Sequence, residues 1–179
     1  MKHLPLKIAV AVGAAAVVSA GAVAYANNSN DVSERLTGFE EVPAISSPGV
    51  GEFQASISRS GDEIRYRLTF SGLESDATQA HIHFENATNN GPVIVFLCSN
   101  LGNGPVGTQP CPAAGGTIRG TIRAGDMTAN GAGQGLAAGE IAEFANAIRA
   151  GATYVNVHSA GRPGGEIRAQ LSDDDHRHG

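Results

Sequence analysis

Polar and apolar residues alternate along most of the chain with the two-residue period of a β-strand. In segment 64–71, apolar side chains occupy every second position, and arginine, threonine or serine fills the positions between them. Ser60-Gly61-Asp62, just before it, is typical of a hairpin turn. The same pattern, separated by glycine and proline, predicts further strands at 53–57, 78–84, 92–98, 116–123, 153–159 and 165–171.

Residues 140–149 break this rhythm, because apolar side chains recur there at the three- and four-residue spacing of a helix. Ile141, Phe144 and Ile148 define its apolar stripe, and Gly151 can cap its end. The stripe is narrow, so we expect it to pack on the same chain rather than bind a partner. Many short strands, frequent turns and one short helix predict an all-β fold, an antiparallel immunoglobulin-like or Greek-key β-sandwich.

The first 26 residues have the features of a secretory signal peptide. Lys2 and Lys7 precede a run of small apolar residues that is short for a spanning helix, so we expect cleavage and no membrane association afterwards. The compartment would then be secreted or periplasmic. The expected organisation is a signal peptide at 1–26, a polar linker at 27–32, one domain at 33–171 and a disordered tail at 172–179.

The charge and the cysteine content of the chain exclude some classes of function. The 179-residue chain has a formal net charge of −5, and its two lysines lie in the expected signal peptide, so the mature chain is more acidic still. Such a charge argues against binding nucleic acid, which depends on cationic contacts to phosphate. Cys98 and Cys111 would meet an oxidising compartment, which favours a disulfide, and they lack the spacing of a metal-binding cysteine pair.

Four segments serve as landmarks along the domain. They are LTGFEEVP at 36–43, FSGL at 70–73, AHIHFENATNNGPVIVFL at 80–97 and YVNVHSAGRPGGEIRAQL at 154–171. In this order they resemble the CHRD domain, a family that is named for its occurrence in chordin and is widespread in secreted bacterial proteins. The resemblance implies an immunoglobulin-like β-sandwich, in agreement with the strand pattern, but no defined activity.

Histidine occupies alternate positions of one predicted strand, at His81 and His83, and returns in another at His158. Both strands place aliphatic side chains on the opposite face, so all three histidines point away from the core and converge if the strands are neighbours. Imidazole binds copper, zinc, iron and nickel, so the three histidines predict a metal site. Glu166 or Glu85 could complete this site or orient an imidazole.

The HIH strand and the later VH histidine are also similar to the copper ligands of Cu/Zn superoxide dismutases, which use a β-sandwich as well. This similarity implies copper as the bound ion, with zinc as the alternative that three nitrogens and a water can hold. The bridging histidine and the zinc cluster of the dismutases have no counterpart here, and no hydrolase motif accompanies the histidines. The sequence therefore argues against dismutase activity and favours a non-catalytic metal-binding protein over an enzyme.

Two other interpretations stay open. The histidines could be surface polar residues that hydrogen-bond to loops, with Glu166 paired to an arginine such as Arg168. The protein would then be a structural or adhesion module that binds other extracellular proteins without a metal. His176 and His178 of the tail could also bind cations, although a solvated tail is the favoured interpretation.

Overall fold

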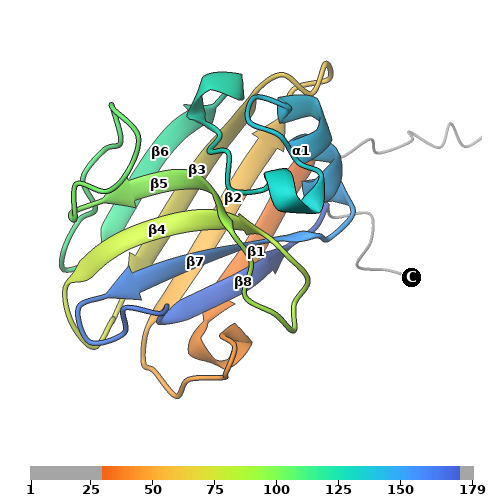
Figure 1. Cartoon of the computed structure of the whole chain (residues 1–179). Helices are drawn as coiled ribbons and strands as arrows, with labels where there is room; N and C mark the ends of the chain where they lie inside the picture. Colours follow the sequence, from red (N-terminus) through yellow and green to blue (C-terminus); the bar gives the residue numbers. More distant parts are fainter. Residues whose placement is uncertain (1–29, 174–179) are drawn as a thin grey trace, which may run out of the picture.

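The computed structural model describes residues 30–173, which form an all-β fold with one α-helix (Figure 1). The helix α1 spans Ile141–Arg149, and three single-turn helices are η1 (Gly38–Glu40), η2 (Ala124–Asp126) and η3 (Ala132–Gln134). The strands are β1 (Asp31–Thr37), β2 (Val50–Ile57), β3 (Ile64–Ser71), β4 (Ala77–Phe84), β5 (Val93–Ser99), β6 (Gly116–Ile122), β7 (Thr153–Ser159) and β8 (Ile167–Leu171). The predicted signal peptide and most of the predicted tail lie outside these residues. Within them, no helix is long and apolar enough to cross a membrane.

The eight strands form one hydrogen-bonded sheet in the order β5-β4-β7-β8-β1-β2-β3-β6, and every neighbouring pair is antiparallel. The predicted all-β antiparallel class is thus confirmed. The predicted immunoglobulin-like or Greek-key sandwich is not confirmed, because the ladder runs through all eight strands without a break. The sheet instead curls almost into a closed cylinder, with its edge strands β5 and β6 side by side (Figure 1).

Side chains bridge the seam between these edge strands, where no backbone ladder forms. Gln109 Nε2 lies 3.1 Å from Leu97 O on β5 and 3.2 Å from Arg119 O on β6. Tyr66 Oη, on β3, lies 3.2 Å from the same Leu97 oxygen and 2.9 Å from Gln109 Nε2. Both strand edges thereby gain partners for backbone groups that would otherwise be unpaired.

The hydrophobic core lies inside the curled sheet, and α1 lies across one end of it (Figure 1). The predicted helix is confirmed, because its apolar stripe is buried while its other side is exposed. The helix ends as expected, since Gly151 adopts a φ of 69° and donates its N–H to Ile148 O at 3.0 Å. The buried stripe consists of Ile141, Phe144, Ala145 and Ile148.

Two further features of the chain bear on the sequence predictions. Cys98 and Cys111 form the predicted disulfide, with their Cα atoms 5.0 Å apart. Strand β1 was not predicted, since only Val32 and Leu36 of its side chains are buried and they stand four residues apart. Its place in the sheet depends on pairing with β2 and β8 rather than on its own alternation.

Candidate metal centre

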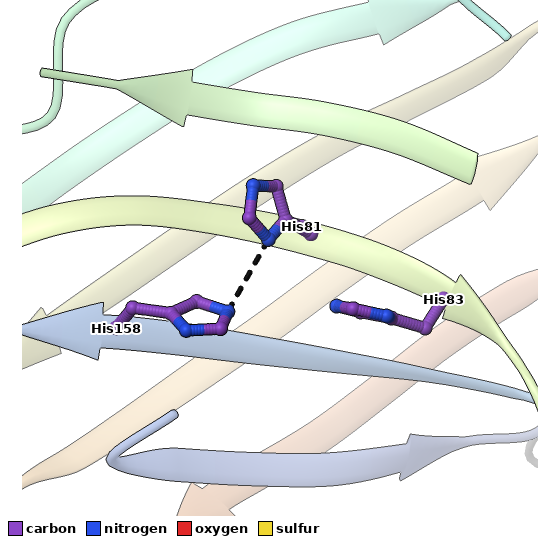
Figure 2. A group of neighbouring side chains, drawn as sticks. All are labelled: His81, His83 and His158. Atoms are coloured by element: carbon purple, nitrogen blue, oxygen red, sulfur yellow. Dashed lines mark hydrogen bonds between the residues drawn. The ribbon is translucent and has the colours of Figure 1, made fainter. Parts of the chain in front are cut away.

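The three histidines of the sequence analysis come together because β4 and β7 are antiparallel neighbours. The register pairs His81 with Asn156 and His83 with Tyr154, which places His158 diagonally across from His81. Figure 2 shows the three imidazole rings turned toward one shared space, His81 and His83 from β4 and His158 from β7. The convergence that sequence reasoning made conditional on strand pairing is therefore confirmed.

The outer face of these strands is buried, although it points away from the core. His81, His83 and His158 are only 3%, 7% and 6% exposed. Loops lie over the rings, since His83 Nδ1 is 2.8 Å from Gly91 O and His158 Nδ1 is 2.9 Å from Pro163 O. The histidines are therefore not surface residues, although the expected hydrogen bonds to loops are present at His83 and His158.

These carbonyl contacts fix the tautomers of two rings. A carbonyl oxygen only accepts hydrogen bonds, so the Nδ1 atoms of His83 and His158 must carry the protons. In the neutral rings, both Nε2 atoms then present lone pairs to the shared space. Metal-binding histidines commonly donate their other ring N–H to a backbone carbonyl in this way, which orients the ring toward the ion.

His81 is held differently. Its Nδ1 lies 3.2 Å from His158 Nε2 and donates a hydrogen bond to that lone pair (Figure 2). Its Nε2 is buried and has no hydrogen-bond partner. The ring instead packs edge-on against Phe96, with 4.4 Å between the ring centroids. A buried polar atom without a partner is costly, so this side chain is the least satisfied of the three.

Burial keeps the imidazoles neutral. It lowers the pKa of His81 to about 2, and proximity to His158 and His83 lowers it further. Burial likewise lowers the pKa of His83 to about 4, although the hydrogen bond to Gly91 partly opposes this. The pKa of His158 is lowered for the same reason, against its hydrogen bond to Pro163. Neutral imidazole is the form that binds a metal ion.

Asn156, which the sequence analysis passed over, stands between two of the rings. Its Oδ1 lies 3.1 Å from His83 Nε2 and 3.1 Å from His158 Nε2. The segment YVNVH contained the information needed to find it, since alternation puts Asn156 and His158 on the same strand face. An asparagine at such a position has no distinctive spacing, however, and sequence alone does not single it out.

Glu41 is a second residue that sequence reasoning missed. It is 6% exposed, and burial raises the pKa of its carboxyl to about 7, against the lowering effects of Arg168 and of a hydrogen bond from Asn156. Its Oε1 has no hydrogen-bond partner. A Cβ atom on Gly165 would overlap both Glu41 Oε1 and Asn156 Nδ2, so this close approach requires glycine.

Arg168, on β8, lies beside the site on the same face of the sheet, directly opposite Asn156 on β7. Its guanidinium carbon lies 3.4 Å from the centre of the Tyr154 ring, and that ring stacks on His83 with 4.5 Å between centroids. Its guanidinium also organises the loop that supplies Gly91 O to His83. The acceptors in that loop are Asn86 O, Ala87 O, Asn89 O and Asn90 Oδ1.

The predicted acidic partner Glu166 makes other contacts. Its carboxylate accepts hydrogen bonds from Ser47 Oγ at 2.6 Å, from the Glu74 N–H at 2.7 Å and from Ser159 Oγ. It is fully buried, so these donors satisfy a carboxylate that would be costly alone. The contacts join three segments of the chain and favour a structural role.

Glu85 also lies in contacts outside the histidine cluster. It accepts hydrogen bonds from the Asn86 N–H at 2.9 Å and from Gln134 Nε2 at 3.2 Å. Among the described histidine, cysteine, aspartate and glutamate residues, the group with metal-ligand spacing is made of the three histidines, whose ligand atoms lie within 4.8 Å of one another. Participation of either glutamate at the metal stays a prediction that these contacts do not support.

Comparison with known proteins gives one match. The model of the CHRD domain family matches residues 32–171, most of the chain and the whole of the sheet from Val32 onward. Among curated proteins and among solved structures, no match reaches significance.

Proposed function

The chain belongs to the CHRD domain family, and from this premise and the buried imidazole cluster we propose that it binds one transition-metal ion through His81, His83 and His158. The observation that carries the proposal is the pair of fixed tautomers. Two neutral rings, tied at Nδ1 to backbone carbonyls, direct their Nε2 lone pairs into the same buried space. His81 would join them through Nδ1 and carry its proton on Nε2.

Copper is the proposed ion, with zinc as the alternative. Imidazole nitrogen suits both ions. The 3.2 Å between His81 Nδ1 and His158 Nε2 is close to the spacing of about 3.3 Å that two nitrogens take around one ion at a bond length of about 2 Å. Both cysteines are in the disulfide, so no thiolate of the described residues competes for the metal.

The proposed setting is a secreted or periplasmic compartment. The Cys98–Cys111 disulfide supports it, because such bonds persist in oxidising compartments. Cleavage after residue 26 belongs to the same proposal, as does the absence of a nucleic-acid or membrane partner. We further propose that the protein binds metal without catalysing a reaction.

One observation favours a second candidate, the adhesion or structural module. The loop that the disulfide closes exposes apolar side chains, with Leu101 57% exposed and Val106 fully exposed. Apolar groups at a loop tip can contact another protein. In that case the histidine cluster would serve only the fold.

Metal titration of protein purified without a tag tests the proposal. Copper(II) and zinc(II) should bind at one equivalent to the wild type, and His81→Gln, His83→Gln and His158→Gln should each lose at least tenfold in affinity. The matched control is a chain that ends at Asp173, which removes His176 and His178 and should bind like the wild type. Circular dichroism must show each variant folded. If only the truncated chain loses metal, the cluster is not the site and the adhesion candidate takes its place.

A further inference from the structure

Asn156 contributes a second kind of donor atom to the histidine cluster. Its Oδ1 is 3.1 Å from the Nε2 of both His83 and His158, and its strand position is directly opposite His81. It is 2% exposed, so no bulk water separates it from the rings. An amide oxygen in this place is close enough to share an ion with the imidazoles.

The orientation of the amide is set on its other side. Asn156 Nδ2 and Glu41 Oε1 approach the same point next to Gly165, which places the amide nitrogen of Asn156, and not its oxygen, beside the Glu41 carboxyl group. The oxygen of the amide is directed at the histidines.

Three hydrogen-bond acceptors face one another here, and no donor hydrogen lies between Asn156 Oδ1 and the Nε2 atoms of His83 and His158. The Nε2 atoms of His83 and His158 carry lone pairs because their Nδ1 atoms hold the protons, and Asn156 Oδ1 carries lone pairs as well. The one proton at hand, on His81 Nδ1, serves His158 alone. Lone pairs facing one another at 3.1 Å in a buried space repel, and a bound cation turns this repulsion into attraction.

We propose that Asn156 Oδ1 is the fourth ligand of the metal ion, which makes the site a closed set of three imidazole nitrogens and one amide oxygen. The inference rests on the proposed function, since it concerns the same ion. It assigns the fourth position to the protein rather than to water. A site without an open position binds metal without activating a water, in keeping with a carrier or a structural site.

Neighbouring donors have the spacing and the chemistry that suit a divalent ion. From His83 Nε2 through Asn156 Oδ1 and His158 Nε2 to His81 Nδ1, successive donors are 3.1, 3.1 and 3.2 Å apart. Ligands at about 2 Å from an ion stand about 2.9 Å apart in a square plane and about 3.3 Å apart in a tetrahedron. The oxygen donor also favours copper(II) or zinc(II) over copper(I), which prefers soft sulfur ligands.

The test compares the wild type with Asn156→Leu and Asn156→Asp. Leucine keeps the approximate size and removes the donor, so copper(II) affinity should fall about tenfold to a hundredfold. Aspartate keeps an oxygen at the same place and should bind at least as tightly as asparagine. Electron paramagnetic resonance of the copper(II) proteins in ¹⁷O-enriched water should show no broadening for the wild type and broadening for Asn156→Leu, where water enters.

The outcomes separate this inference from the proposed function. Broadening of the wild-type signal by ¹⁷O-water would overturn the closed site, whether or not the variants fold. Equal affinity of wild type and Asn156→Leu would also overturn it, while loss of binding in the three histidine variants would leave the proposed function standing. A wild type that binds neither copper(II) nor zinc(II) would overturn both.

Discussion

The outward faces of two regions of the same sheet are built in opposite ways. The covered region comprises β4, β7 and β8. Its outward side chains lie under loops, and every residue of β7 is buried. The open region comprises β3 and its neighbour β6. Its outward residues Arg65, Arg67 and Arg119 are exposed. Both regions present apolar side chains to the same core, so the difference arises entirely on the outside.

Two arginines show what this difference requires. Arg168, in the covered region, is 1% exposed and is surrounded by carbonyl acceptors and the Tyr154 ring. Arg67, in the open region, stands directly opposite Arg119, a like-charge pair that water can screen. A buried polar side chain therefore needs a specific partner for each group, whereas an exposed one does not. The metal centre occupies the region where a missing partner is costly, as at His81 Nε2 and Glu41 Oε1.

Acidification should produce the largest contrast between the regions. Unfolded histidines take up protons near pH 6.5, whereas folding lowers the pKa of His81 to about 2 and of His83 to about 4. The unfolded state then binds more protons, so stability falls as pH falls below 6.5. Between pH 6.5 and 4.5 the two rings should lower the free energy of unfolding of the metal-free protein by roughly 4 kcal/mol. His158 should add to this loss, and Glu41 should oppose it by roughly 2 kcal/mol.

Urea unfolding in the presence of a chelator measures this loss. A control is His83→Gln, which removes one of the titrating rings and should make the pH dependence shallower. Stability that stays constant between pH 6.5 and 4.5 would mean that the folded protein accepts protons on these rings, in conflict with their burial.

Replacement of the buried arginine should give the next largest effect. Arg168→Met keeps the length of the stem but leaves the carbonyl groups of loop 86–90 without a donor, so we expect a loss of about 3 kcal/mol. Arg67→Met, in the open region, should change stability by less than about 0.5 kcal/mol. Urea unfolding at pH 7 measures both. Equal effects of the two substitutions would show that burial does not distinguish them.

Glu41→Gln should stabilise the protein, by a smaller amount that depends on pH. The pKa of Glu41 rises from 4.5 to about 7 on folding, so ionisation destabilises the folded state as pH rises from 4.5 through 7. Glutamine keeps an oxygen for Asn156 and carries no charge. We expect a gain of about 2 kcal/mol at pH 6 and almost none at pH 4.5. The exposed Glu52→Gln on β2 is the control and should show no such difference.

Alternation along the chain was enough to predict most strands and the shared outward direction of the histidines, whose convergence stayed conditional on strand pairing. In YVNVH and AHIHF, the aliphatic side chains identify the core face, and the polar positions follow on the other face. Once β4 and β7 pair, the three imidazoles must meet. The helix was equally accessible, since its stripe repeats at a spacing that no strand has.

Alternation does not reveal what lies over the outer face. The loops that supply Gly91 O and Pro163 O have no periodic pattern, so the burial of the histidines could not be predicted. Glu41 and Asn156 were missed for the same reason, because their roles depend on contacts between distant segments near Gly165. Nor does alternation show whether eight strands make one sheet or two, because it does not specify which edges pair.

The smallest predicted effect concerns the like-charge pair of the open region. Arg67→Glu places an acid opposite Arg119 and should stabilise the protein by about 0.5 kcal/mol at low ionic strength. The gain should disappear in 1 M salt, because the pair is exposed and screened. Arg119→Glu should act in the same direction, and the double variant, which restores a like-charge pair with the opposite sign, should lose the gain. Urea unfolding of the four proteins forms a closed cycle, and purely additive effects would show that the two side chains do not interact.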